Sequence, residues 1–171
     1  MLALALAMTL AADGGAPPRT ISVTLGGTLA EVKGEAWPTR RGQPADSHEF
    51  KGPLDAVVRL PSGREYRVTT TSMTVNTFAN DRARVRSIYL DLGTAPTWPE
   101  IVERSQQPLR ELGVSEERRL DWKQRLLAKP VPFPNYPVEA CVTVGTTMRE
   151  KGRVGFYLSL ELTLIEPPCA E

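Results

Sequence analysis

The sequence predicts a single α+β domain over residues 19–171, built from an antiparallel sheet of about six strands with two helices inserted before the last hairpin. Two observations carry this prediction. Apolar and polar residues alternate with a period of two in several separate segments, which is typical of half-buried strands. Between these segments, residues 97–127 combine helical spacing with helix-capping residues. Helices packed on one face of an antiparallel sheet define the α+β class.

The first four predicted strands form an antiparallel meander. The segment ISVTL at 21–25 alternates, and the segment 54–60 alternates again before turn residues at 61–63. The alternation resumes at 66 and continues through 75, which gives a hairpin. After another turn, residues 85–92 return as the fourth strand.

Two helices follow the meander. Thr97 and Glu100 form a capping box at the start of the first helix, and Gly113 ends it. Pro108 falls inside this helix and is expected to kink or break it. Ser115 caps the second helix, whose apolar side is supplied by Leu120, Trp122, Leu126 and Leu127.

The last predicted hairpin is the clearest strand signal. In residues 154–164 every even position is apolar, which predicts one long strand of roughly a dozen residues paired with the segment before it. Residues 129–139 carry four prolines and are expected to be an extended crossover from the helices to this hairpin. Residues 33–51 are mostly polar and are expected to form a long loop.

The first residues of the chain predict where in the cell the protein is located. Residues 1–12 are apolar almost without a break, but a membrane-spanning helix needs about 20 apolar residues, so no integral membrane span is expected. The run fits the core of a secretory signal, with small residues Thr9 and Ala11 before a cut after Ala11. We expect residues 1–18 to be a signal peptide and linker and the protein to be periplasmic; an ordinary N-terminal helix is the alternative.

The two cysteines agree with export. Cys141 and Cys169 fit one disulfide in an oxidising compartment. A two-residue turn at Lys151-Gly152 would place Cys141 opposite Leu162, from which the tail can just reach back far enough for the bridge. A register shifted so that Cys141 faces Leu160 leaves the tail too short.

The sequence does not indicate an enzyme, so no catalytic residue, cofactor or metal site is expected. His48 is the single histidine and is interpreted as a solvated loop residue, because a metal site needs more ligands at better spacing. Neither cysteine lies in a C-x-x-C motif, and no P-loop or G-x-G-x-x-G string occurs. Glu161, on the outer face of the last strand, keeps open the alternative of a small secreted hydrolase or carbohydrate-active enzyme with carboxylates in a sheet cleft.

Arginine-rich surfaces are the candidate binding sites. The chain has 21 Lys and Arg against 20 Asp and Glu, which argues against nucleic acid as the partner. Clustered arginines can instead steer binding to an acidic protein. The candidate residues are Arg82, Arg84 and Arg86, which alternate into the fourth strand, and Arg118, Arg119 and Arg125 on the second helix.

The segments VRSIYLDLGTAPTWPEIVERSQQPLRELGV, CVTVGTTM and GRVGFYLSLELTL resemble a pattern of small exported proteins of Gram-negative bacteria. Some of these are similar to periplasmic immunity proteins, which neutralise toxic effectors delivered by contact-dependent secretion systems. The resemblance covers about half of the chain and carries over no functional residue. It implies a non-enzymatic inhibitor that acts by protein–protein contact, with an effector as its partner.

Overall fold

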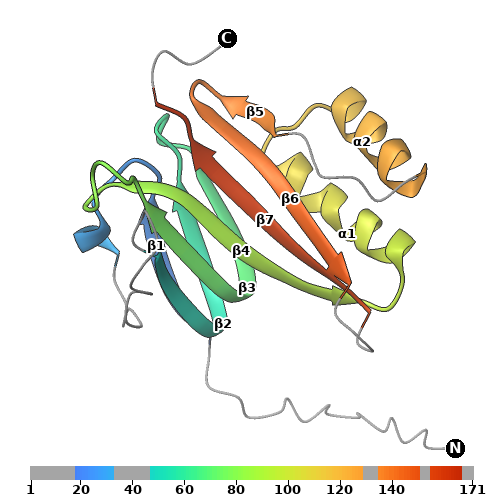
Figure 1. Ribbon diagram of the computed structural model, residues 1–171, viewed down its shortest axis with the longest axis horizontal. Helices are drawn as coiled ribbons and strands as arrows, with labels where there is room; N and C mark the ends of the chain where they lie inside the picture. The colour runs from blue at the N-terminus through green and yellow to red at the C-terminus, as the bar shows by residue number, and fades with distance from the viewer. Residues whose placement is uncertain (1–17, 33–46, 129–134, 151–154, 167–171) are drawn as a thin grey trace, which may run out of the picture.

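The computed structural model describes residues 18–32, 47–128, 135–150 and 155–166, and its elements form a seven-stranded sheet with two helices (Figure 1). The predicted signal peptide and linker, residues 1–18, lie almost entirely outside the described residues. No helix of the described part is long and apolar enough to cross a membrane. The elements are β1 (Arg19–Thr24), the 3-10 turn η1 (Leu29–Glu31), β2 (Ser47–Arg59), β3 (Glu65–Thr77), β4 (Val85–Ala95), α1 (Trp98–Glu111), α2 (Glu116–Ala128), β5 (Tyr136–Glu139), β6 (Val142–Glu150) and β7 (Phe156–Leu164).

The α+β class is confirmed, and the strand count is corrected from six to seven. The strand order is β1-β2-β3-β4-β7-β6-β5, and every neighbouring pair is antiparallel except β1 and β2, which are parallel. The meander therefore begins at β2 rather than at β1. A parallel pair requires a long crossover, and the chain between Thr24 and Ser47 supplies the length.

β5 is the strand that the sequence did not predict. It lies at the end of the expected proline-rich crossover and pairs with β6, with Tyr136 opposite Val144. Pro137 is tolerated because β5 is an edge strand, where a missing N–H need not break a ladder. The ring of Tyr136 lies 5.0 Å from that of Trp122, so β5 also packs against α2.

Alternation in β7 builds the centre of the core, as predicted. Leu158, Leu160 and Leu162 are fully buried, and the strand is nine residues long rather than a dozen. Leu160 and Leu162 lie opposite Leu90 and Ile88 of β4, which are equally buried. Cross-strand apolar pairs of this kind stabilise a sheet on its covered face.

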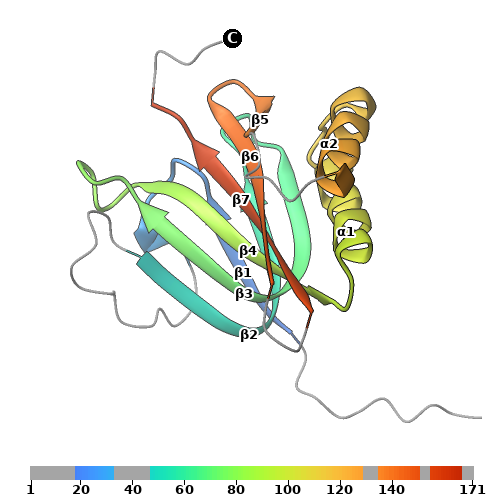
Figure 2. The same cartoon turned by 45° about the vertical axis from the view of Figure 1, so that its right-hand side comes forward.

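The first half of the sheet is strongly curled (Figure 2). The chain after β1 returns to the start of β4, where the Gly26 amide donates to the Val85 carbonyl at 2.9 Å and the Val85 amide donates to Gly27 at 2.9 Å. The ladder between β2 and β3 shifts register between Lys51 and Leu54, which bends the hairpin. These contacts bring the chain at the end of β1, which is the edge strand beside β2, to the start of β4.

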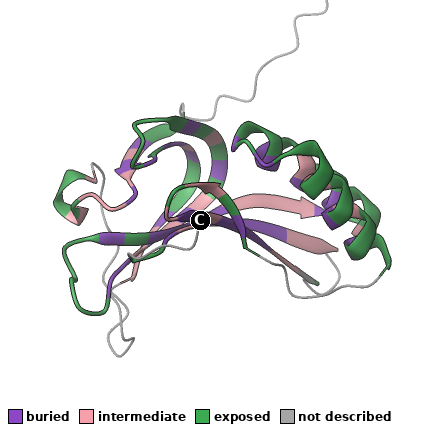
Figure 3. Cartoon of the chain, turned by 90° about the horizontal axis from the view of Figure 1, so that it is seen from above, coloured by how far each residue is buried: buried purple, intermediate pink, exposed green. Residues whose placement is uncertain are grey.

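The two helices lie along one face of the sheet, where α1 contacts β4, β7 and β6 (Figure 3). The Thr97 side chain accepts a hydrogen bond from the Glu100 amide, which confirms the predicted cap. At the other end, the Val114 amide donates to Leu109 and the Gly113 amide donates to Arg110. This is a Schellman ending, and it needs the positive φ of +85° that Gly113 adopts.

Two expectations for the helices change: a break at Pro108 is wrong, while a kink there stays a prediction, and the apolar side of α2 is corrected. Pro108 does not break α1, which runs from Trp98 to Glu111 with Pro108 buried inside it. The apolar side of α2 is narrower than predicted, because Trp122 and Leu126 are buried but Leu120 and Leu127 are 50% and 46% exposed. The predicted cap at Ser115 is confirmed by its side chain, which accepts from the Arg118 amide.

The β6–β7 register differs from the one expected. Val142 lies opposite Leu164, which puts Cys141 opposite Ile165, and the Ile165 amide donates to the Cys141 carbonyl at 2.7 Å. The prediction of a two-residue turn at Lys151-Gly152 is therefore wrong. β6 ends at Glu150 and β7 begins at Phe156, so the connection between them is longer than two residues. Cys169 lies outside the described residues, so the disulfide stays a prediction.

The predicted loop over residues 33–51 is wrong in its last part, because residues 47–51 belong to β2. Apolar Phe50 is buried in this part of the strand and lies opposite Met73 of β3. The remainder of the predicted loop, up to residue 46, lies outside the described residues.

Candidate functional site

The predicted arginine group of β4 lies beside a surface hollow. Arg86 is in β4, Arg84 is just before it, and Arg82 is in the β3–β4 turn, where strand alternation no longer applies. Arg84 and Arg86 flank Val85, which is fully buried, so their side chains leave the core on the same side. The prediction of a shared face therefore holds for two of the three arginines.

The hollow has a volume of about 320 Å³ and is formed where the β3–β4 turn meets the end of β7. We call it the Arg86 hollow. Its apolar part includes Ile165, which is 43% exposed. Asn80 and Glu166 join its two sides through a hydrogen bond of 3.3 Å. The lining residues are Phe78, Ala79, Asn80, Arg86, Thr163, Leu164, Ile165 and Glu166.

Two arginines of this group have different surroundings. Arg84 is held in place, because its Nε donates to the Gly26 carbonyl at 3.2 Å and its guanidinium lies 5.2 Å from the centre of the Phe78 ring. Arg86 forms no hydrogen bond or ion pair with the described part of the chain and is exposed. Its guanidinium is therefore available to an anionic group that enters the hollow.

The predicted arginine group of α2 is divided by the structure. Arg119 donates from Nε to the Val114 carbonyl at 3.1 Å, next to the start of α2. Arg125 forms an ion pair with Asp121, four residues earlier, at 2.9 Å. Arg118 is exposed, and its backbone amide serves the helix cap. This surface therefore offers fewer uncommitted positive charges than its sequence implies.

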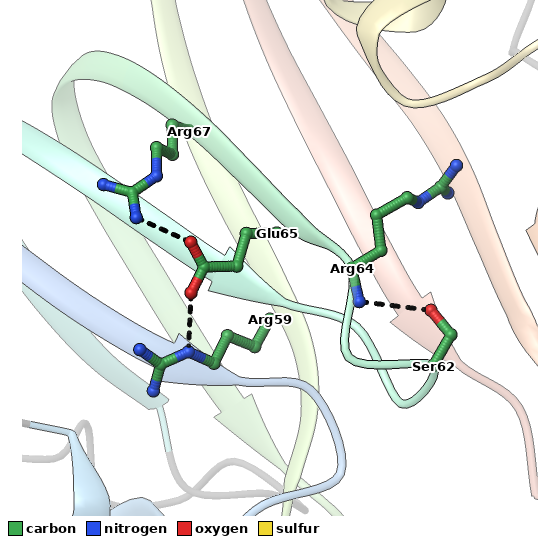
Figure 4. A network of polar contacts seen from close by, with 5 residues as sticks. All are labelled: Arg59, Ser62, Arg64, Glu65 and Arg67. Carbon is green, nitrogen blue, oxygen red and sulfur yellow. Dashed lines mark hydrogen bonds and ion pairs between the residues drawn. The ribbon is translucent and has the colours of Figure 1, made fainter.

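A further charged cluster lies on the β2–β3 hairpin (Figure 4). Glu65 pairs with Arg59 at 2.9 Å and with Arg67 at 2.6 Å. Hydrogen bonds from Arg59 and Arg67 to the carboxylate lower the pKa of Glu65 below its ordinary value. Arg59 and Glu65 are directly opposite in the ladder, so the hairpin register could have indicated this pair from the sequence.

The hairpin turn itself ties three elements together. Arg64 donates from its guanidinium to the Leu112 carbonyl at 3.0 Å and to the Val138 carbonyl at 3.4 Å. Ser62 donates from both its amide and its hydroxyl to the carboxylate of Glu139, at 3.1 and 2.6 Å. These contacts fix the turn against the end of α1 and against β5, which marks the turn as structural.

His48 is not the solvated loop residue that the sequence predicts. It lies in β2 opposite Val75, and both of its ring nitrogens are buried without a hydrogen-bond partner. Among the described residues, no group of three or more histidine, cysteine, aspartate or glutamate side chains could hold a metal ion. His48 is therefore placed as part of the packed sheet.

Glu161 lies on the face of β7 opposite its buried leucines, as expected from alternation. Its carboxylate accepts a hydrogen bond of 3.0 Å from the Thr163 hydroxyl. Asp91 is its diagonal neighbour on β4, since Tyr89 lies opposite Glu161 and Asp91 lies opposite Ser159. Asp91 accepts from the Gly93 amide at 2.7 Å, so each carboxylate is engaged with its own strand.

No protein-family model, no curated protein and no solved structure matches the chain.

Proposed function

We propose that the protein is a non-enzymatic binding protein that recognises an acidic protein partner through the Arg86 hollow. The supporting observation is the uncommitted guanidinium of Arg86 at the wall of a hollow that also exposes Ile165. The hollow combines apolar side chains with one positive charge, Arg86, and one negative charge, Glu166, whose carboxylate accepts a hydrogen bond from Asn80. The Arg86 side of this surface suits a partner segment in which a carboxylate stands beside an apolar side chain. Arg84 and Arg82 add positive charge near the same site, which favours approach of an acidic surface.

The proposal includes the role that the resemblance implies. An immunity-type inhibitor in the periplasm would use such a surface to bind a toxic effector and block its action. A small hydrolase with paired carboxylates remains the alternative, and no observation on Asp91 and Glu161 favours it. The α2 surface around Arg118, Arg119 and Arg125 remains a rival position for the partner.

Three charge reversals distinguish these positions. Full-length wild-type protein and the variants Arg86→Glu, Arg118→Glu and Arg110→Glu are immobilised, and proteins from the native cell envelope are captured on each. We expect one protein to be retained by the wild type, by Arg118→Glu and by the control Arg110→Glu, and to be lost with Arg86→Glu. Arg110 is an exposed residue of α1 outside both surfaces, so it controls for the change in net charge.

Each other outcome has a defined meaning. Loss with Arg118→Glu alone would move the partner to α2. Equal capture by all four proteins would contradict recognition through either arginine group.

A further inference from the structure

A second hollow, of about 250 Å³, lies between α1 and the sheet and is distinct from the Arg86 hollow. We call it the Tyr66 hollow. Its walls are mainly apolar, with a proline ring from the helix facing side chains of three strands. The residues that matter here are Tyr66, Val68, Leu92, Pro108, Glu111 and Leu158.

Tyr66 brings an unsatisfied polar group to this hollow. The residue is only 4% exposed, and its hydroxyl is buried with no hydrogen-bond partner. Buried polar atoms in folded proteins nearly always have a partner, so this group is an exception that needs an explanation. Burial raises the pKa of Tyr66, and the carboxylate of Glu111 raises it further, so the hydroxyl keeps its proton at neutral pH and remains a donor.

The helix side of the hollow brings hydrogen-bond acceptors. Pro108 has no N–H, so the carbonyl of Arg104 lacks the donor that an α-helix normally supplies four residues later. Arg104, Pro108 and Glu111 all line the hollow. The carboxylate of Glu111 accepts one hydrogen bond of 2.9 Å from Gln107 and has capacity for more.

We propose that the Tyr66 hollow binds a small uncharged ligand with an apolar ring and one hydroxyl group, of which phenol is the simplest. The ring would pack against Pro108, Leu92 and Leu158. The ligand hydroxyl would accept from Tyr66 and donate to the Arg104 carbonyl or to Glu111. The hollow is lined by one positive side chain, Arg104, and one negative side chain, Glu111, so their charges offset each other and an uncharged ligand is favoured.

Size and access both bear on the occupant. A single water needs only about 10–15 Å³ of this kind of volume, so the 250 Å³ of the hollow has room for a molecule larger than one bridging water. The Tyr66 hydroxyl is sealed from solvent, so a ligand reaches it only when side chains at the rim move aside. Gln107 and Glu111 are exposed at this rim and are hydrogen-bonded to each other at 2.9 Å, so their side chains have to move for a ligand to enter.

The test is a titration of the full chain with phenol, in which the chemical shifts of the backbone amides are monitored by NMR. We expect saturable shifts at residues 66–69, 92, 104–107, 109–111 and 158, with a Kd of about 1 mM, as suits a ligand of this size. Toluene, which has the same ring without the hydroxyl, is expected to bind about fivefold more weakly. In Tyr66→Phe, the affinity for phenol should fall to that for toluene, while the affinity for toluene should be unchanged.

Folding and specificity are controlled by matched variants. Tyr66→Phe removes only the unpaired hydroxyl, so it is expected to fold, and Tyr157→Phe on β7 should bind phenol as the wild type does. Val68→Phe should fill the hollow and abolish binding of both probes. Absence of saturable shifts with phenol, or equal phenol affinity in Tyr66→Phe, would overturn the proposal and leave water only in the hollow.

Discussion

Arg64 shows how one side chain can hold separate parts of the fold. Its guanidinium bonds backbone carbonyls at the end of α1 and in β5, so the β2–β3 turn depends on both elements. Among the residues that the structure describes, Arg67, three residues later, bonds only the carboxylate of Glu65. The two arginines therefore form a natural comparison between a structural contact and a surface ion pair.

We predict that Arg64→Ala lowers the free energy of unfolding by about 1.5–3 kcal/mol, the range for hydrogen bonds to charged groups. Arg67→Ala should cost less than about 1 kcal/mol, because exposed ion pairs contribute little. Urea unfolding of the two variants measures the difference. Equal losses would mean that the Arg64 contacts do not stabilise the turn.

The raised pKa of Tyr66 predicts that the folded protein loses stability at alkaline pH. Burial, with a smaller effect of Glu111, raises its pKa in the folded protein above the value of 10 that the unfolded chain has. The neutral phenol therefore favours folding fully below pH 10, and this contribution is lost as the pH rises above 10 towards the folded pKa.

Unfolding free energies at pH 8 and pH 11 test this effect in the wild type and in Tyr66→Phe. The wild type should lose more stability than the variant between the two values. Tyr136 also has a raised pKa through burial, so some alkaline loss should remain in Tyr66→Phe. An identical loss in both proteins would show that Tyr66 titrates as an ordinary tyrosine.

Among the elements, α1 separates what local sequence can predict from what it cannot. Its start at Thr97 and its end at Gly113 follow from side-chain and backbone chemistry within a few residues. Its passage through Pro108 does not, because the proline ring is buried against the sheet and tertiary packing offsets the missing hydrogen bond. The relative size of these two effects can be measured.

We predict that Pro108→Ala raises the free energy of unfolding by about 1–2 kcal/mol. Proline costs about 3 kcal/mol relative to alanine inside a helix, whereas removal of the buried ring atoms loses about 1–2 kcal/mol of burial. Thermal or urea unfolding measures the balance. A net loss of stability would show that packing of the ring outweighs the helix penalty.

The strands show a similar division. Period-two alternation identified β2, β3, β4 and β7, because burial of one face requires apolar residues at every second position within each strand. Strand partners are set by the whole fold, so neither the parallel pairing of β1 nor the addition of β5 could be read from their own residues. The β6–β7 register was missed because the connection is longer than a tight turn.

The register between β6 and β7 brings the position opposite Cys141 closer in the chain to Cys169 than the sequence predicted. Cys141 lies opposite Ile165, so Cys169 follows its position by only four residues instead of seven. The tail therefore needs less reach than in the expected register. We retain the prediction that Cys141 and Cys169 are bonded.

Thiol counting under denaturing, non-reducing conditions tests the bridge in protein purified from the cell envelope, and no free thiol is expected. Reduction should lower the free energy of unfolding by about 3–4 kcal/mol, because the bridge closes a loop of about 27 residues. Two free thiols would remove the bridge and weaken the expectation of a periplasmic location.

The sequence predicted the arginines of the candidate site but not the hollow beside them. Arg82, Arg84 and Arg86 stand out as a charged run, but the hollow beside Arg86 is built from the β3–β4 turn and the end of β7. Phe78 and Ile165 are far apart in the chain and meet only through the pairing of β4 with β7. Recognition surfaces of this kind need the sheet order before they can be located.

Arg86 is proposed to contribute a positive charge to recognition of an acidic partner. The most direct measurement is the Kd of the captured partner for wild-type protein and for Arg86→Glu, at low and at high salt. We expect a Kd for Arg86→Glu that is at least about tenfold higher at low salt and that depends less on salt. An unchanged Kd with an unchanged salt dependence would contradict recognition through the Arg86 hollow.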